Sequence, residues 1–437
     1  MKKKAKPTRY RRRLAVIIFA LAVLSGLALP QSGLLDFAMP LWRPCTIAER
    51  IQAANLDEAV GSCPAGNGAD VIELHEDLAL WARLPNIRSE ITIEGNDHTI
   101  SGDGKVGMFS VLAGGKLKIM RAQLTKGAGG QLAGAIEIRG GVVHLVDVTI
   151  SDSAMDRGAA ITLDGGRLYM RDSEVLGRTD IRSHAITNED GSVSLVDTTI
   201  EGFHFDFRGG AIINNGSMTI AHSVIRKNSA MSGAAIYNRG KLDIRSATFA
   251  ENAADLGGAL HNYRADVTIA DSQFVANRAK GQGGAIFSRE TPIRINRSEF
   301  SLNSAEEAGA IGGMDTWLTI RDSEVSNNSA EEKGGGLKIL NGSLRIEGSK
   351  LLGNDGLDGG GIYSENARLT ISDNVFRGNR ADRGGGIYYA EGVIVLRDSV
   401  FQSNCARVWG ANLYTNAVEL TESGNAFEDS QFGDCDD

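Results

Sequence analysis

Six aromatic or imidazole side chains recur along the second half of the chain at intervals of about 25 residues, in two groups: Tyr237, His261 and Phe287, then Tyr363, Tyr388 and Tyr414. If these positions are equivalent on stacked strands about 4.8 Å apart, the column can bind sugar rings or a protein partner. Alternatively, neighbouring rings only stack on one another and stabilise a sheet. The column is a candidate binding stripe.

Three carboxylates, those of Asp147, Asp172 and Asp197, show the same interval. Carboxylates on adjacent coils repel one another unless a hard cation such as Ca²⁺ bridges them or a pKa rises. Asp is also an ordinary turn former. The same site holds Asp in four later coils, at Asp271, Asp322, Asp373 and Asp398. We predict Asx-type turns, with calcium as the alternative, and expect no cofactor.

The elements that must position these residues follow from a repeat. The pattern apolar-x-apolar-x4-apolar recurs with steps of 24 to 26 residues, starting at Leu117, Val143, Leu168, Val193, Met218, Leu242, Val267, Ile293, Leu318, Leu344, Leu369 and Ile394. A second register of small residues followed by an apolar anchor, as in Gly-Gly-Ala-Ile, moves in phase with it. The apolar runs are short, alternate with period two and are bounded by Gly, Asn, Asp and Ser, which indicates strands.

About 25 residues with three short strands and three turns make one coil of a parallel β-helix. We therefore predict an all-β solenoid of about 12–14 coils, roughly 60 Å long at the inter-strand spacing. Glycine supports the tight corners, because 54 residues of 437 are Gly.

A third column consists of asparagines, each three residues after the last apolar position of its coil: Asn228, Asn252, Asn277, Asn303, Asn328, Asn354, Asn379 and Asn404. Asn tolerates the left-handed backbone of a sharp corner, and stacked amides can hydrogen-bond from coil to coil. We predict a structural asparagine ladder.

Both ends of a β-helix need cover, because they expose unpaired strand edges. Thr46 to Glu49 fit a capping box that opens a short N-terminal helix. The four cysteines form one pair near each end, and an oxidising compartment favours disulfides. We expect the local pairing, Cys45 with Cys63 and Cys405 with Cys435, although three connectivities exist.

The N-terminus carries eight Lys or Arg residues before residue 14, followed by an apolar run from Leu14 to Leu29. This layout is typical of a secretory signal, with an uncleaved membrane anchor as the alternative. The whole chain has a net charge of −8, so removing those eight charges leaves −16. Such an acidic body repels nucleic acid. We expect a monomer that is periplasmic, secreted or anchored to the inner membrane, with the β-helix outside the cytoplasm.

A resemblance follows from these motifs. The segment Cys45-Thr-Ile-Ala-Glu-Arg-Ile-Gln-Ala-Ala-Asn55, with Ile91-Thr-Ile-Glu-Gly and the later Gly-Gly-Ala-Ile…Asn repeats, resembles exported bacterial proteins of the CSLREA-domain group. The repeats resemble the right-handed β-helix of polymorphic outer-membrane proteins and of the pectate-lyase-like superfamily. This resemblance implies a right-handed coil. The cap departs from the group, because its Leu-Arg-Glu-Ala core reads Ile47-Ala-Glu-Arg50 here.

The resemblance also implies what an enzyme of this superfamily needs. Its lyases need a Lys or Arg base near an acidic Ca²⁺ cluster, and its hydrolases need two or three convergent carboxylates. Neither pattern is found, coil lengths leave no room for cleft walls, and none of the 7 histidines pairs with Ser or Cys in a recognisable motif. We predict no catalytic residues.

The sequence thus predicts five segments: a signal peptide or anchor (1–30), a linker (31–44), the N-terminal cap with irregular first coils (45–108), the repeats (109–420) and a C-terminal tail (421–437). The predicted function is an exported, non-catalytic scaffold or adhesin-like surface for a glycan or a cell-surface protein. The alternatives are a polysaccharide lyase or glycoside hydrolase, and a membrane-tethered spacer.

Overall fold

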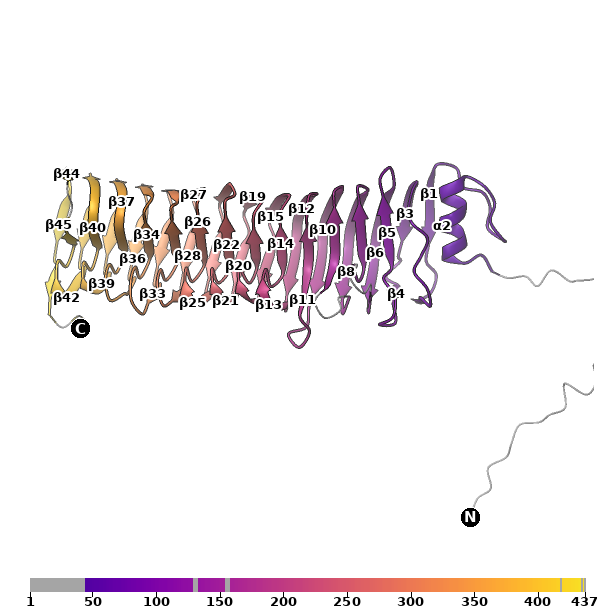
Figure 1. The fold of residues 1–437 in the computed structure, drawn as a ribbon, viewed down its shortest axis with the longest axis horizontal. Helices are drawn as coiled ribbons and strands as arrows, with labels where there is room; N and C mark the ends of the chain where they lie inside the picture. Colours follow the sequence, from indigo (N-terminus) through magenta and orange to yellow (C-terminus); the bar gives the residue numbers. More distant parts are fainter. Residues whose placement is uncertain (1–43, 129–132, 154–157, 417–418, 434, 436–437) are drawn as a thin grey trace, which may run out of the picture. The chain divides into compact units, whose positions relative to one another are not determined.

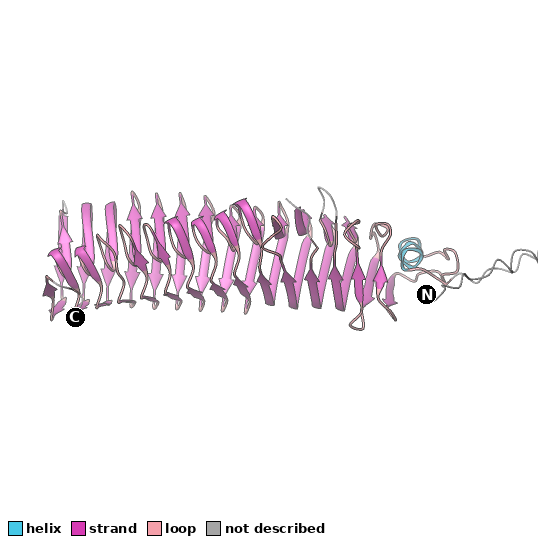
Figure 2. Ribbon diagram, turned by 90° about the horizontal axis from the view of Figure 1, so that it is seen from below, coloured by secondary structure: helices cyan, strands magenta, loops and turns pink. Residues whose placement is uncertain are grey.

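The computed structural model describes residues 44–128, 133–153, 158–416, 419–433 and 435. Contacts divide the chain into two units, Met1–Pro44 and Cys45–Asp437, and the second holds nearly all described residues. This unit is a stack of about 14 turns of short parallel strands, with a helix at its N-terminal end (Figure 1). Figure 2 shows the strands side by side along the whole stack. The unit is all-β apart from that helix, as the repeat predicts.

Strands of successive coils pair in parallel and line up in columns. The first column follows the small-residue corner and contains β5 (Phe109–Leu112), β7 (Ile136–Arg139), β9 (Gly158–Asp164), β11 (Ser183–Asn188), β14 (Ile212–Asn214), β18 (Ile236–Asn238), β22 (Leu260–Tyr263), β26 (Ile286–Arg289), β30 (Ile311–Met314), β34 (Leu337–Leu340) and β43 (Leu413–Thr415). The second column contains β1 (Ala69–Glu73), β3 (Glu90–Glu94), β15 (Ser217–Ala221), β19 (Lys241–Arg245), β23 (Val267–Ala270), β27 (Pro292–Asn296), β31 (Trp317–Arg321), β35 (Ser343–Glu347) and β44 (Glu419–Ser423).

The third column contains β2 (Leu78–Ala79), β4 (Thr99–Ser101), β16 (Val224–Arg226), β20 (Thr248–Ala250), β24 (Gln273–Val275), β28 (Glu299–Ser301), β32 (Glu324–Ser326), β36 (Lys350–Leu352), β38 (Val375–Arg377), β41 (Val400–Gln402) and β45 (Ala426–Glu428). Longer strands join two columns. The second and third are joined by β6 (Lys116–Thr125), β8 (Val142–Ser151), β10 (Arg167–Leu176) and β12 (Ser192–Glu201), and the first and second by β37 (Ile362–Ser372) and β40 (Ile387–Arg397).

A fourth column, which the three-strand expectation lacks, lies after the asparagine corner. It contains β13 (His204–Arg208), β17 (Ser229–Ser232), β21 (Ala253–Leu256), β25 (Arg278–Gln282), β29 (Ser304–Ala305), β33 (Ser329–Ala330), β39 (Arg380–Arg383), β42 (Cys405–Trp409) and β46 (Gln431–Phe432). Coils such as the one that contains β22, β23, β24 and β25 therefore have four strands, one more than the sequence predicts. The strands also continue past residue 420, so the predicted tail includes the last coil.

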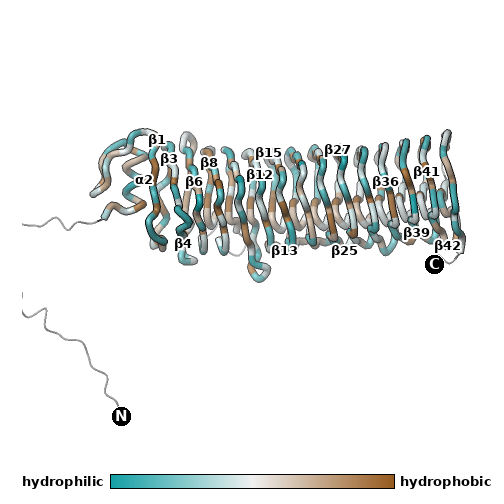
Figure 3. Tube along the Cα trace, turned by 180° about the vertical axis from the view of Figure 1, so that it is seen from behind, coloured by the Kyte–Doolittle hydropathy of each residue, from teal (hydrophilic) through white to brown (hydrophobic). Residues whose placement is uncertain are grey.

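The core is built from the predicted apolar columns. In the coil that begins at Ile286, the side chains of Ile286, Ile293, Ile295 and Phe300 are all buried. Because successive residues of a strand point to opposite faces, every second residue faces this interior and the others point outward. Figure 3 shows this alternation of apolar and polar residues along the coils. A coil buries its apolar residues only against its neighbours, so stacking stabilises the fold.

The N-terminal end is closed by helix α2 (Ile47–Leu56). Its capping box is present: the Thr46 hydroxyl accepts from the Glu49 backbone N–H at 3.2 Å, and the Thr46 N–H donates to the Glu49 carboxylate at 3.0 Å. Ile51 and Ala54 are buried against the first coils. The predicted cap helix is confirmed.

Two disulfides are present with the predicted local pairing, Cys45–Cys63 and Cys405–Cys435. Disulfides persist in oxidising compartments, so they indicate an extracytoplasmic protein. Within the described residues no helix is long and apolar enough to cross a membrane. The predicted signal or anchor at Leu14 to Leu29 lies outside those residues.

Candidate functional site

The six residues of the candidate binding stripe do share one column. In each first-column strand the anchor and the residue two further on face the interior, and the stripe residue between them faces away. The structure covers most of this face, however. Tyr237, Phe287, Tyr363 and Tyr388 are only 4–8% exposed, and His261 and Tyr414 are half-buried. The expected open aromatic face is therefore largely closed.

The cover comes from the chain that turns from the fourth column into the first. At this corner Gly384 has a φ of +68°, and a Cβ there would lie 2.4 Å from the carbonyl oxygen of Ile387. Only glycine permits so tight a turn at low cost. The turn places the ends of the fourth-column strands over the stripe: Arg208 lies 5.1 Å from the Tyr237 ring, and Arg383 lies 5.2 Å from the Tyr388 ring.

The two aromatic groups differ in geometry. His261 meets Tyr237 and Phe287 edge-on, with ring centroids 5.2 Å apart in both contacts. Tyr363, Tyr388 and Tyr414 stack face to face, with centroids 5.0 and 4.9 Å apart. Burial, reinforced by nearby cationic side chains, lowers the pKa of the His261 imidazole to about 4. The first group is thus a neutral, packed cluster, and the second is a regular stack.

Charged side chains that sequence reasoning missed flank the tyrosine stack. Arg383 donates from Nε and Nη2 to the two carboxylate oxygens of buried Asp358, at 2.7 and 2.6 Å. Such a bidentate pair fixes the guanidinium plane. Asp358 forms an isolated β-bridge with Arg383 of the next coil, so their 25-residue separation is the available sequence signal.

The hydroxyls of Tyr363 and Tyr388 stay protonated. The Tyr363 hydroxyl donates to Glu365 at 2.7 Å, and burial together with this bond raises the Tyr363 pKa. Burial also raises the Tyr388 pKa. A protonated phenol both donates and accepts hydrogen bonds, as sugar hydroxyls do.

An exposed surface adjoins this stack at the C-terminal coils. Trp409 is 62% exposed, Val408 50% and Leu357 47%. Trp409 pairs with Arg383 in the fourth column, and the hydrogen bond to Asp358 raises the Arg383 pKa. We call Leu357, Arg383, Val408, Trp409 and Tyr414 the Trp409 surface. It combines exposed apolar groups with a fixed cation.

The three aspartates of the predicted column have the backbone conformation of a turn. Asp147, Asp172 and Asp197 have φ values of 56°, 49° and 47°, which is the left-handed conformation of a sharp corner. Asp and Asn adopt this conformation more readily than other non-glycine residues. Among the described residues, no group of three His, Cys, Asp or Glu side chains could hold a metal ion.

The asparagine ladder has the predicted contacts. The amide nitrogen of each ladder residue from Asn228 to Asn379 donates to the amide oxygen of the next, at 2.9–3.0 Å. Each amide from Asn252 to Asn404 also donates to the carbonyl of a core residue in the preceding coil, such as Phe274 for Asn303 at 2.8 Å. The ladder is buried and does no surface chemistry.

A second asparagine ladder was missed. Asn188, Asn214, Asn238 and Asn262 face the interior two residues after the first-column anchors, and the first three donate to the next at 2.7–2.8 Å. The signal was present in the sequence, because Asn recurs there in four successive coils. It is a structural feature.

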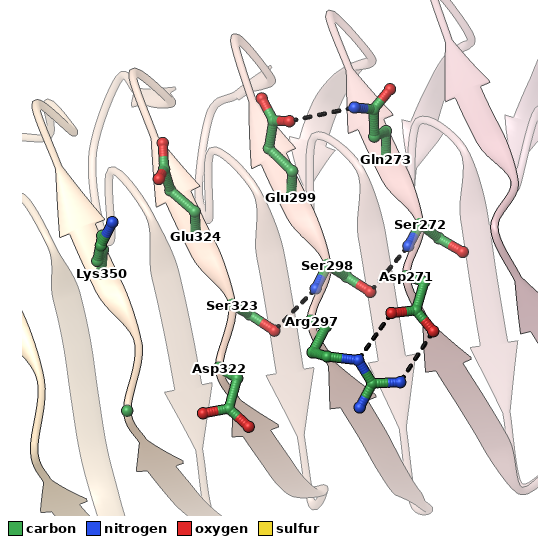
Figure 4. A pocket seen from close by; sticks show the side chains of 11 residues that line it. Asp271, Ser272, Gln273, Arg297, Ser298, Glu299, Asp322, Ser323, Glu324 and Lys350 are labelled. Carbon is green, nitrogen blue, oxygen red and sulfur yellow. Dashed lines mark hydrogen bonds and ion pairs between the residues drawn. The ribbon is translucent and has the colours of Figure 1, made fainter.

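The surface of the described residues includes two hollows that are lined by charged side chains. One, of about 450 Å³, runs along the corner between the second and third columns (Figure 4). In it Arg297 binds Asp271 at 2.7 and 2.9 Å, while Gln273 donates to Glu299 at 3.4 Å. Figure 4 shows these side chains lining one open face, with neighbouring serines linked below them. Arg297 and Asp271, on adjacent coils, thus neutralise each other in this hollow.

The larger hollow, of about 940 Å³, lies in the N-terminal half beside the loop 178–182. Asp152 and Asp180 line it, but Arg178 pairs with both, at 3.9 and 2.7 Å. The Arg178 hydrogen bond lowers the Asp180 pKa, which disfavours Asp180 as the general acid of a hydrolase.

At its rim His204 contacts the Ser229 hydroxyl through Nδ1 at 2.8 Å and Asp206 through Nε2 at 3.3 Å. Arg182 binds the same Asp206 carboxylate at 2.9 Å. His204 and Asp206 are about one-third and two-fifths exposed, so the cluster is solvated. The sequence search found no such histidine because the two strands are 25 residues apart.

Comparison with known proteins concerns the fold. A family model described as right handed beta helix region matches residues 257–432. The periplasmic alginate epimerase AlgG, in the crystal structure of a point mutant, is similar with 10% identity over 73% of this chain and 76% of that chain, at a TM-score of 0.40. The A-module of the mannuronan C-5 epimerase AlgE6 from Azotobacter vinelandii is similar with 11% identity over 75% of this chain and 92% of that chain, at a TM-score of 0.36.

No curated protein matches the chain significantly. The parallel pairing from β1 to β46 and the family model agree on the architecture. The chain folds as a right-handed parallel β-helix.

Proposed function

We propose that this protein is an extracytoplasmic, non-catalytic β-helix scaffold that binds a glycan at the Trp409 surface. The observation that carries the proposal is the exposed Trp409, which pairs in the fourth column with Arg383, the residue that lies over the Tyr388 ring. Trp409 is 62% exposed, so a partner that covers its indole ring removes apolar surface from water, which favours binding. Of the predicted binding stripe, only Tyr414, which is half-buried, belongs to this proposed glycan-binding surface.

The chemistry of the surface suits a sugar. The C–H faces of a pyranose ring stack on indole and phenol rings, and its hydroxyls pair with protonated phenols and a guanidinium. Arg383 keeps its orientation because Asp358 holds it, so little side-chain entropy is lost on binding. A cell-surface protein is the other ligand class that the experiment below distinguishes.

The test is a binding assay of the full protein against immobilised pectins, alginates and glycosaminoglycans. We expect Trp409→Ala to weaken binding about tenfold, as for a central aromatic contact. Trp317→Ala is the matched control, because Trp317 is 59% exposed but lies in β31 of the second column. Equal losses in both variants, or no binding by the wild type, contradict the glycan proposal.

The same incubations test the alternative function. A polysaccharide lyase produces new unsaturated ends, and a hydrolase produces new reducing ends. Either product overturns the non-catalytic part of the proposal. Tyr388→Ala adds a second readout: if it leaves every affinity unchanged, the buried stripe is purely structural. The membrane-tethered spacer and the likeness to polymorphic outer-membrane protein repeats stay predictions.

A further inference from the structure

A basic face opens on the three long strands β6, β8 and β10, which pair in parallel and lie side by side in the N-terminal half (Figure 1). In the second-column part of these strands, alternate side chains are buried in the core and the others point outward. The outward residues are Lys116, Lys118, Met120, Val142, His144, Val146, Arg167, Tyr169 and Arg171. They include four cations and no carboxylate, in a chain with a net charge of −8. The face therefore attracts anions that the acidic chain as a whole repels.

Three of these cations have charges that a ligand can use. Lys116 binds the Glu90 carboxylate of β3 at 2.9 Å. Among the described residues, no Asp or Glu side chain forms an ion pair with Lys118, Arg167 or Arg171, and all three cations are exposed. A guanidinium without an acidic partner can bind an oxyanion through two parallel hydrogen bonds.

An aromatic pair stands at the centre of this face. His144 and Tyr169 are register partners on β8 and β10, and their rings stack with centroids 4.6 Å apart and planes 15° apart. Tyr169 is 38% exposed. On its other side it pairs with Ser194 of β12, whose side chain is short. A ligand ring that lies over Ser194 can therefore stack on the free face of the Tyr169 ring.

The two arginines lie on either side of this stacking position. Arg167 and Arg171 stand two residues before and two residues after Tyr169 on β10, about 6.6 Å away along the strand in each direction. Their partners on β12 are Ser192 and Val196, so neither arginine faces a carboxylate there. The order along the strand is cation, ring, cation. This order fits a polymer whose rings carry an anionic group on each side.

The chemistry of the anion follows from where the cations stand. A uronate carboxylate is bonded directly to a ring carbon, so its charge lies close to the ring that stacks. A sulfate ester is attached through an exocyclic oxygen, so its charge lies farther from the ring, which suits cations two residues away from Tyr169. Its three terminal oxygens also match the donor fork of a guanidinium. The surface therefore favours sulfated over carboxylated sugars.

We propose that Lys118, His144, Arg167, Tyr169 and Arg171, which we call the Tyr169 surface, bind a sulfated polysaccharide. One sugar ring lies over Ser194 against Tyr169, and the two arginines bind sulfates on the two sides of that ring. Lys118, two coils from Tyr169, adds to the positive potential. The site goes beyond the proposed function, because it involves no residue of the Trp409 surface.

The probe is a heparin oligosaccharide, titrated into the full protein by calorimetry. The matched probes are the same oligosaccharide after removal of its sulfates and an alginate oligosaccharide of the same length. We expect heparin to bind at least about tenfold more tightly than either, because only its sulfates reach both arginines. Equal affinity for alginate, or no binding of heparin, overturns the proposal.

Substitutions separate the contribution of the charges from that of the ring. The double variant Arg167→Gln/Arg171→Gln should weaken heparin binding at least about tenfold and flatten its dependence on salt concentration. Tyr169→Ala should weaken binding about tenfold and keep that dependence, since it removes only the stacking contact. Arg294→Gln is the matched control, because Arg294 is exposed in the same outward column on β27 but has threonines as neighbours. A loss in the control as large as in the double variant contradicts the site.

His144 supplies a readout inside the surface. Burial and the charge of Lys118 lower the pKa of the His144 imidazole, while Glu90 opposes them. Arg167 and Arg171 are the cations on the adjacent strand at its other side. A bound sulfate should raise the His144 pKa, because a nearby anion favours the imidazolium. An NMR titration with and without heparin measures the change, and an unchanged pKa at saturation would show that the ligand binds elsewhere.

Trp409→Ala keeps this result apart from the proposed function. It should leave the heparin affinity unchanged, whereas Tyr169→Ala should lower it. The reverse result would overturn the Tyr169 surface and support the Trp409 surface. Arg167, Tyr169, Arg171 and Arg294 are exposed, so far-UV circular dichroism should show their variants folded.

Discussion

The two halves of the β-helix close the corner after the third column in different ways. In the C-terminal half, eight buried asparagines occupy this corner, and fourth-column strands follow it. In the N-terminal half the spacing places Gly127, Ser153, Arg178 and Phe203 there. Two contacts confirm the register: the Phe203 N–H donates to Asn228 Oδ1, and the Gly127 N–H donates to the Ser153 hydroxyl.

This difference shows what an asparagine side-chain amide contributes at the corner of a coil. An asparagine amide accepts from one neighbouring coil and donates to another, so it satisfies backbone groups that a corner leaves unpaired. Ser153 reproduces part of this by donating to the Leu124 carbonyl at 3.2 Å, but Gly127 has no side chain to do so. Beyond the amides the fourth column extends by one more strand, β13 after Phe203, and the larger hollow lies beside the loop 178–182.

Substitutions in the core should reveal the largest difference in stability between the two halves. Phe274 stacks between Phe249 and Phe300, at 4.7 and 4.8 Å, and is fully buried. Phe274→Ala should lower the free energy of unfolding by about 4 kcal/mol, because it removes a large side chain and leaves a cavity. Val175→Ala, at the same core position of the other half, should cost about 2 kcal/mol. Urea unfolding measures both, and equal losses would contradict the stronger packing of the laddered half.

The asparagine corner should show the next largest effect. Asn303→Ala removes an acceptor for the Asn277 N–H and amide, at 2.9 and 3.0 Å, and a donor to the Phe274 carbonyl. Leaving these buried groups unpaired should cost about 3 kcal/mol. Arg178→Ala, at the equivalent corner of the other half, removes only exposed ion pairs and should leave the free energy of unfolding nearly unchanged. A similar loss in both variants, measured by urea unfolding, would show that the ladder is dispensable.

The smallest difference concerns the pH dependence of stability that one buried histidine in each half produces. Burial lowers the His184 pKa to about 4, and burial with nearby Arg208 and Arg289 lowers the His261 pKa to about 4. In the unfolded chain each titrates near 6.5. Between these values the unfolded state binds more protons, so stability falls as the pH drops from 6.5 towards 4, by at most about 1.4 kcal/mol per pH unit per histidine.

Replacing one histidine should therefore remove part of the slope. We expect His184→Gln and His261→Gln each to flatten the dependence of the unfolding free energy on pH in this window. His184 packs on Phe205 at 4.0 Å, and His261 packs between Tyr237 and Phe287, so neither site should collapse. An unchanged slope in either variant would show that the replaced histidine is protonated in the folded state.

The repeat, and with it the fold, can be read from the amino-acid sequence. A coil of 24 to 26 residues with apolar residues at fixed offsets can bury them only by stacking on similar coils. The repeated apolar positions that begin at Leu117 and end with the coil of Ile394 therefore identify the core residues. The asparagine ladder, the cap box at Thr46 and the cysteine pairing depend on local spacing, and each was predicted correctly. The second ladder, at Asn188 to Asn262, was equally readable from its period.

Tertiary structure alone decided which outward residues meet solvent. The stripe residues face away from the core as alternation requires, yet the turn at Gly384 folds the fourth column over them, and no spacing rule encodes that cover. The pairing of Asp358 with Arg383, and the exposure of Trp409 beside them, depend on side chains from different coils. Strand period fixes the direction of a side chain, whereas its accessibility depends on what the rest of the chain places above it.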